Sequence, residues 1–134
     1  MIKKLWTTSP FATDLGLLIL RLVCGFFLAT HGWGKFIHYG ENAAKFPDPL
    51  HVTPQVSALL TIFAELFCSV FLMLGLFTRL ALIPLMITMV MIIFVIHGSD
   101  PLGDKEHAAL FLAPFILLFL SGPGSYSLDR LLKK

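Results

Sequence analysis

Four long apolar segments, separated by short polar or proline-containing stretches, dominate the pattern of hydrophobic positions. They cover residues 15–37, 56–77, 80–97 and 108–120. About 20 mostly apolar residues in a helix are needed to cross the ~30 Å hydrocarbon core of a bilayer. The last segment has only 13 residues before the sequence SGPG, so we expect its helix to cover residues 106–121. The pattern therefore predicts four membrane-spanning helices.

The connections between these segments indicate how the helices are joined. Residues 40–55 contain three prolines, residues 97–106 contain one proline and two glycines, and a turn is expected at Thr78 and Arg79. Lipid offers no partner for unpaired backbone groups, so single segments cross a membrane only as helices. We predict an all-α fold, a polytopic membrane protein with an antiparallel four-helix transmembrane bundle, formed as a single domain over residues 1–134.

The composition agrees with a lipid-embedded chain. Hydrophobic residues make up 57% of the 134 positions and charged residues only 13%, whereas soluble domains have about 25% charged residues. The net charge is only +2 and its residues are scattered between apolar segments. No basic stripe is present, which argues against nucleic-acid binding.

The distribution of lysine and arginine predicts the orientation, because cytoplasmic flanks carry the excess of these residues. One side is expected to hold Lys3, Lys4, Arg79, Arg130, Lys133 and Lys134, and the other Lys35, Lys45 and Lys105. We predict a plasma (inner) membrane protein with both termini in the cytoplasm and residues 40–55 outside. The aromatic residues expected at the inner interface are Trp6 and Tyr126, and those at the outer interface are Trp33 and Tyr39.

Arg21 and Glu65 are charged residues inside apolar segments. Such residues cost about 2.5–3.5 kcal/mol at the centre of a span and nearly always face the protein interior. Arg21 lies six residues after Leu15, and Glu65 lies twelve before Phe77. Since an arginine can reach about one helical turn, we predict that the two form a buried polar pair. The pair could fix helix register, or it could handle a ligand or a proton.

A second polar group is expected near the outer ends of the helices. His31, Lys35, His97 and Glu106 are predicted at similar heights, with His107 beside them. The first four are our candidate ligand-binding residues, surrounding an outward-facing pocket for a quinone carbonyl or a small anionic sulfur compound. The alternative is a solvated network of helix-end side chains without a ligand. Histidine and carboxylate are metal ligands, but the spacing is not a metal-site signature, so no metal is assigned.

Cys24 and Cys68 are predicted at nearly equal depth, nine residues from the inner ends of their helices. A dithiol redox pair is one interpretation. Apolar packing is the favoured one, because a thiol in an apolar environment has little reactivity.

The sequence also resembles a known family. The resemblance is carried by LRLVCGFFLATHGWGKF, AELFCSVFLMLGLFTRLA, IHG and GPGSYSLDRLL, and it covers residues 15–132. Together these resemble the DoxX family of small integral membrane proteins, named after a subunit of an archaeal thiosulfate:quinone oxidoreductase. The matching positions are Arg21, His31, Gly32, Lys35, Glu65, Gly75, Thr78, Arg79, His97, Glu106 and residues 122–129. The resemblance implies a four-helix membrane protein that serves redox or thiol-stress complexes.

Two functional hypotheses follow. The first is a membrane component of an electron-transfer or thiol-redox system that binds a quinone or a small sulfur compound. The sequence has no haem-attachment, flavin or iron–sulfur motif, so electrons would be carried by the bound molecule or by a redox partner protein. The second is a non-catalytic scaffold or a small-solute transport component, for which a homo-oligomer would supply more helices. Whether the protein is an enzyme is left open by the sequence.

Overall fold

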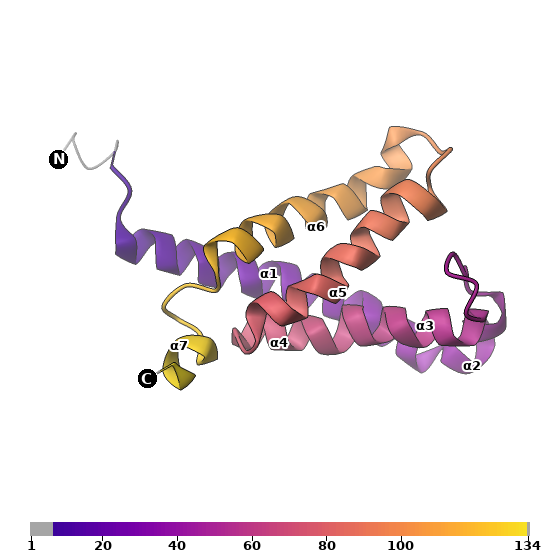
Figure 1. Cartoon of the computed structure of the whole chain (residues 1–134), viewed down its shortest axis with the longest axis horizontal. Helices are drawn as coiled ribbons and strands as arrows, with labels where there is room; N and C mark the ends of the chain where they lie inside the picture. Colours follow the sequence, from indigo (N-terminus) through magenta and orange to yellow (C-terminus); the bar gives the residue numbers. More distant parts are fainter. Residues whose placement is uncertain (1–6, 134) are drawn as a thin grey trace.

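The computed structural model describes residues 7–133, except for the side chain of Asp104, and within this range every regular element is helical. Figure 1 shows long helices running in alternating directions, with short helices at both ends of the molecule. Lys3, Lys4, Trp6 and Lys134, on which part of the predicted orientation rests, lie outside the described residues.

The first long helix, α1 (Pro10–Ile37), begins five residues before the predicted position 15. Ser9 is extended and Pro10 occupies the first helical turn, where its missing N–H leaves no gap in the hydrogen bonding. The short polar stretch with Thr13 and Asp14 is therefore part of the helix. Two short elements, α2 (Tyr39–Asn42) and η2 (Ala43–Lys45), follow in the loop predicted for residues 40–55.

The second long helix is continuous but contains a wider turn in its middle. It consists of α3 (Pro54–Ile62), the π-helical segment η3 (Phe63–Cys68) and α4 (Ser69–Leu74). The Thr53 hydroxyl caps its start by accepting a 3.2 Å hydrogen bond from the Val56 N–H. Gly75 ends it at φ 70°, a left-handed conformation in which a side chain would be strained. The predicted range 56–77 was therefore displaced by two to three residues.

The third long helix joins α5 (Thr78–Met91) to the π-helical segment η4 (Ile92–Ile96), and the fourth is α6 (Leu102–Ser121). The predicted ranges 80–97 and 106–121 locate the apolar parts of both helices. Gly122 ends α6 at φ 83°. The tail contains a further short helix that the sequence analysis did not predict, α7 (Leu128–Leu132), whose first turn is capped by the Ser127 hydroxyl.

Three of these helices are long and apolar enough to cross a membrane, namely Pro10–Ile37, Pro54–Leu74 and Thr78–Ile96. The remaining long helix, α6, has a similar length but carries Asp104, Lys105 and Glu106 in its first turns. Large apolar side chains are exposed on all four, among them Phe26, Phe63, Phe94 and Leu120. Such surfaces suit lipid and not water, so an all-helical membrane fold is confirmed.

The helices pack in two antiparallel pairs. α1 lies along α4 and η3, and α5 lies along α6, while η3 also contacts α5 and so joins the pairs. Leu28, Leu72, Leu82, Leu85 and Phe115 are almost completely buried between them. In Figure 1 the pairs are closest near α4 and diverge toward the end that holds α2, the start of α3 and the end of η4. This divergence makes room for a pocket at that end.

Candidate ligand-binding pocket

A partly buried ion pair joins α1 to η3. The Lys35 Nζ lies 2.5 Å from Glu65 Oε2, and the Glu65 side chain is only 2% exposed. Gly32, one turn earlier on α1, makes this approach possible. A Cβ at Gly32 would lie 2.6 Å from the Leu66 nitrogen, so any larger residue would push the two helices apart.

The predicted pairing of Arg21 with Glu65 was wrong, although both side chains are buried as expected. Arg21 donates from Nη1 to the carbonyls of Leu72 and Met73 at 3.5 Å, and from Nη2 to the Tyr126 carbonyl. It therefore caps the end of α4 and holds the tail. Because Gly32 lies opposite Glu65, and Arg21 is eleven residues from Gly32, the two charges are separated by roughly 16 Å along α1. That distance exceeds the reach of an arginine.

The tail is held by a second charged residue, Asp129. Its carboxylate accepts hydrogen bonds from the Phe77 N–H at 2.7 Å and the Thr78 N–H at 2.9 Å, at the start of α5. Burial raises the pKa of Asp129, but these hydrogen bonds and the nearby Arg21 charge outweigh it and leave the pKa below its usual value. Arg21 and Asp129 are therefore structural residues at the end of the molecule opposite Lys35.

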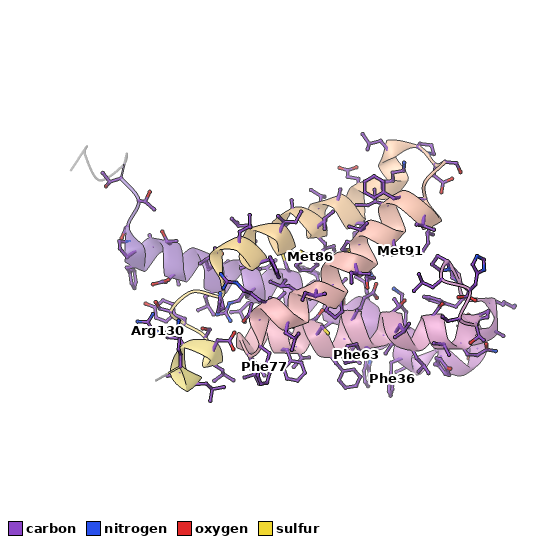
Figure 2. All side chains as sticks on the ribbon, viewed as in Figure 1. Phe36, Phe63, Phe77, Met86, Met91 and Arg130 are labelled. Carbon is purple, nitrogen blue, oxygen red and sulfur yellow. The ribbon has the colours of Figure 1, made fainter. Side chains whose placement is uncertain are left out.

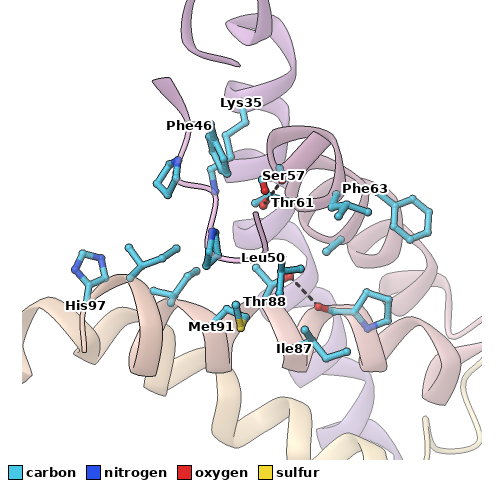
Figure 3. A pocket seen from close by; sticks show the side chains of 17 residues that line it. Lys35, Phe46, Leu50, Ser57, Thr61, Phe63, Ile87, Thr88, Met91 and His97 are labelled. Carbon is cyan, nitrogen blue, oxygen red and sulfur yellow. Dashed lines mark hydrogen bonds between the residues drawn. The ribbon is translucent and has the colours of Figure 1, made fainter. Parts of the chain in front are cut away.

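A pocket of about 490 Å³ lies between the two helix pairs, at the end of the molecule where they separate and where Lys35 lies. Its walls come from the loop at residues 46–50, from α3 and η3, and from α5 and η4. Most of its lining side chains are apolar, including Phe46, Leu50, Ile87 and Met91 (Figure 3). This volume lies within the 300–1,000 Å³ range of pockets for cofactors and small molecules.

The polar groups in the pocket differ in whether they still have hydrogen-bond donors available for a ligand. The hydroxyls of Thr61 and Thr88 donate to the carbonyls of Ser57 and Pro84 at 2.9 and 2.8 Å (Figure 3). Ser57 donates to Asp48. Lys35 has three N–H donors, of which Glu65 takes one. The Lys35 ammonium group, whose charge is neutralised by Glu65, is therefore the principal hydrogen-bond donor available to a ligand.

Of the four predicted ligand-binding residues, Lys35 and His97 line this pocket, whereas His31 and Glu106 do not. The His97 Nδ1 lies 2.8 Å from Asp100 Oδ2. The exposed His31 ring stands edge-on to that of His107, with centroids 4.9 Å apart, and Glu106 is exposed. α1 packs on η3 and α4 whereas η4 packs on α5 and α6, so equal height does not bring the four residues together.

Asp48 stabilises the loop at residues 46–50, which forms one wall of the pocket. The sequence analysis did not identify this residue. Its carboxylate accepts hydrogen bonds from the Val52 N–H at 3.0 Å, the Thr53 N–H at 2.9 Å and the Ser57 hydroxyl at 2.7 Å. Thr53 is held at φ 115°, an unusual conformation for a residue with a side chain. The signal in the sequence was an aspartate between two prolines shortly before a helix, a common place for turn-forming side-chain hydrogen bonds.

The hydrogen bonds of Asp48 predict a pH-dependent loop. Burial raises the pKa of Asp48, but the hydrogen bonds from Ser57, Thr53 and Val52 and the nearby His51 charge lower it below its usual value. A carboxyl group with a lowered pKa stabilises the folded loop above its usual pKa of ~3.9 and loses this effect as the pH falls through the lowered value. The loop should therefore stay closed at neutral pH and loosen only in strong acid.

We expect Asp48→Asn to loosen the loop already at pH 7. NMR in detergent micelles should then show the Val52 and Thr53 amide resonances shifted upfield, since their hydrogen bonds to a carboxylate are weakened. The matched control is Asp100→Asn, which removes an exposed loop carboxylate outside the pocket. Unchanged Val52 and Thr53 resonances in Asp48→Asn would contradict this assignment.

The two cysteines belong to the packed interior. Cys24 and Cys68 are both free and buried, and both are part of the same apolar cluster as Leu28 and Leu72. Among the side chains that the structure describes, no group of three or more His, Cys, Asp or Glu is arranged to hold a metal ion.

Comparisons with known proteins give a consistent result. The family model named DoxX matches residues 16–98. The inner membrane protein YqjF of Escherichia coli (strain K12) is 27% identical over 127 residues, covering 90% of this chain and 95% of that protein. An uncharacterised membrane protein of Mycobacterium tuberculosis is 30% identical over 132 residues, covering 87% and 81% of the two chains. An uncharacterised protein of Haemophilus influenzae is 30% identical over 126 residues, covering 85% and 88%. No solved structure gives a significant match.

Proposed function

The chain belongs to the DoxX family of membrane proteins, and from this premise we propose that it binds a quinone in the pocket beside Lys35, as a membrane component of an electron-transfer system. The observation that carries the proposal is the ion pair of Lys35 with the buried Glu65 at the edge of an otherwise mainly apolar pocket. Lys35 and His97 are the ligand-binding residues retained from the sequence analysis.

The chemistry of the pocket favours a neutral carbonyl-bearing guest over a small sulfur anion. Glu65 neutralises the Lys35 charge at 2.5 Å, so no unpaired cation is offered to an anion by this pair. The two remaining N–H donors of Lys35 can hydrogen-bond to a quinone carbonyl. The ring and tail of a quinone are apolar and suit side chains such as Leu50, Ile87 and Met91.

The two π-helical segments add support, because both border this pocket. Phe63 and Ala64 come from η3, and Ile92 and Ile96 come from η4. π-Helical turns in otherwise regular helices are frequent at functional sites, since each inserts a residue at some cost in helix stability. A quinone bound here would carry the electrons itself, and a redox partner protein would supply or remove them.

The transport alternative has less support than ligand binding. Between Arg21 at one end and the Lys35–Glu65 pair at the other lie Cys24, Leu28, Cys68 and Leu72, all buried in one apolar cluster. A path for a polar solute would have to pass through these packed layers. A purely structural scaffold leaves the pocket of about 490 Å³ without a role.

We further propose that α6 crosses the membrane as the fourth helix, with Lys105 and Glu106 at the headgroup level. Its 20 residues give a length of roughly 30 Å, and it packs along α5. The lysine and arginine bias supports an orientation with both termini in the cytoplasm of a cell with an inner membrane. The pocket then faces outward, together with residues 40–55.

Cysteine labelling tests this orientation. A single cysteine at Asn42, an exposed residue of the outer loop, should react with a membrane-impermeant maleimide in intact cells. Cys24 and Cys68 are replaced by alanine in the same chain, since both are buried packing residues. The matched control is a cysteine at Ser125, an exposed residue of the tail, which should react only after permeabilisation. The reverse pattern would invert the orientation.

Quinone binding can be measured on the detergent-purified chain with a short-chain benzoquinone and isothermal titration calorimetry. We expect Lys35→Met and Thr61→Trp each to weaken binding at least tenfold, the first by removing the donor and the second by filling the pocket. Thr30→Trp is the matched control, because Thr30 is an exposed residue of α1 whose hydroxyl also donates to a carbonyl of its own helix. Equal affinity in the Thr61→Trp and Thr30→Trp variants would contradict the proposed site.

A further inference from the structure

A second pocket, of about 530 Å³, lies at the end of the molecule opposite Lys35. It is formed by the start of α5, the end of α6 and the tail, with Asp14 of α1 at its edge. Three cationic residues line it: Arg79, Arg130 and Lys133. Figure 2 shows Arg130 at this end of the molecule, near Phe77 at the turn between α4 and α5. This pocket shares no lining residue with the pocket beside Lys35.

The acidic residues of this second pocket are already engaged by the backbone. Asp129 accepts from the Phe77 and Thr78 N–H groups, and Asp14 accepts from the Ser125 N–H at 3.1 Å. Arg79 donates to the carbonyls of Phe119 and Leu120 at the end of α6. The side chains of Arg130 and Lys133 are exposed, and neither has a hydrogen-bond or ion-pair partner within residues 7–133.

Apolar side chains border the same pocket. Phe77 is 58% exposed and Leu80 67% exposed, and both line the pocket. Leu120, next to the pocket residue Ser121, is 72% exposed. These residues lie where the apolar helices α5 and α6 meet the polar tail. If both helices cross the membrane as proposed, this is near the depth at which phospholipid headgroups join their acyl chains.

We propose that the second pocket binds the phosphate of an anionic phospholipid, such as phosphatidylglycerol. Arg130 and Lys133 contact the phosphate, Arg79 adds positive charge beside it, and the acyl chains lie along Phe77, Leu80 and Leu120. A guanidinium group offers a fork of N–H donors that matches two phosphate oxygens. Basic pockets at the cytoplasmic ends of membrane helices bind anionic headgroups in this way. The apolar border distinguishes a lipid phosphate from a free one, which gains nothing from it.

Native mass spectrometry of the full chain in mild detergent tests the lipid site. With equal amounts of phosphatidylglycerol and phosphatidylcholine of identical acyl chains, we expect at least a tenfold preference for phosphatidylglycerol. R130Q/K133Q should reduce this preference at least tenfold, since each basic residue near a headgroup contributes about fivefold. The matched control K45Q/K105Q removes the same charge from the other end of the molecule and should leave the preference unchanged.

Two further measurements separate headgroup binding from a loss of folding. R130K/K133R keeps both charges and should retain the preference, while R130Q/K133Q should melt within a few degrees of the unmodified chain. No preference in the unmodified chain, or an equal loss in K45Q/K105Q, would overturn the lipid site. Displacement of phosphatidylglycerol by millimolar inorganic phosphate would assign the pocket to free phosphate and overturn it as well. The quinone affinity of R130Q/K133Q should be unchanged. A failure to find the lipid preference would therefore leave quinone binding beside Lys35 untouched.

Discussion

Replacing Lys35 by methionine should lower the free energy of unfolding by about 2–3 kcal/mol. Breaking a fully buried ion pair by removing one partner costs about 3–5 kcal/mol, because the other charge stays buried and uncompensated. The Lys35 side chain is 35% exposed, whereas Glu65 is 2% exposed. Water that reaches Lys35 screens part of the interaction, so the expected loss is below the range for a fully buried pair.

Removing both partners should cost less than removing Lys35 alone. In the double variant Lys35→Met/Glu65→Leu no buried carboxylate remains, and apolar side chains of similar volume replace the pair. Unfolding in detergent, followed by circular dichroism, should therefore show that Glu65→Leu recovers at least about 1 kcal/mol in the Lys35→Met background. Lys45→Met, at an exposed lysine of η2, is the control and should change stability by less than about 0.5 kcal/mol. Simple additivity of the two single losses would contradict the pair.

Replacing Arg21 by methionine should cost about 3 kcal/mol and release the tail. The guanidinium supplies donors to the Leu72, Met73 and Tyr126 carbonyls, and the Arg21 side chain is completely buried. Hydrogen bonds from charged groups contribute about 1.5–3 kcal/mol in soluble proteins, and about 0.6 kcal/mol is the average for side-chain hydrogen bonds between membrane helices. Three such contacts, two of them long at 3.5 Å, would together contribute about 1.8 kcal/mol at the membrane average and about 4.5 kcal/mol at 1.5 kcal/mol each, so we expect a loss of about 3 kcal/mol.

Tail release gives this prediction a readout besides stability. Without Arg21, the Tyr126 carbonyl loses its donor, and limited proteolysis should cut near Arg130 at least tenfold faster under native conditions. Arg130→Met is the control for the stability measurement and should leave the free energy of unfolding nearly unchanged. The Arg130 side chain is exposed and has no partner within residues 7–133. An Arg21→Met variant as stable as Arg130→Met would show that Arg21 does not cap α4.

The apolar parts of the helices could be predicted from the sequence, whereas their ends and their register could not. A run of apolar residues identifies a helix that suits lipid. Its ends depend on caps such as Thr53, Gly75 and the distant Asp129 carboxylate. The tail helix α7 is too short to show a periodic pattern.

The burial of Arg21 and Glu65 could be predicted from the sequence, but their partners could not. Burial of Arg21 and Glu65 follows from the cost of placing a charge in lipid. Their partners depend on how α1 and η3 are aligned, which is set by the close contact at Gly32 and by the π-helical turn around Glu65. Neither leaves a simple signal in a single sequence. The separation of His31 from His97 likewise depends on which helices pack together.

The most direct test of the proposed quinone binding is to locate the bound molecule. A photoreactive azidoquinone is bound to the purified chain, illuminated and mapped by mass spectrometry of the peptides. We expect labelling of the pocket wall, at Leu50, Ile87 or Met91, and loss of that labelling in Thr61→Trp but not in Thr30→Trp. Labelling confined to lipid-facing residues such as Ile19 or Phe26, with no difference between the two variants, would contradict quinone binding in this pocket.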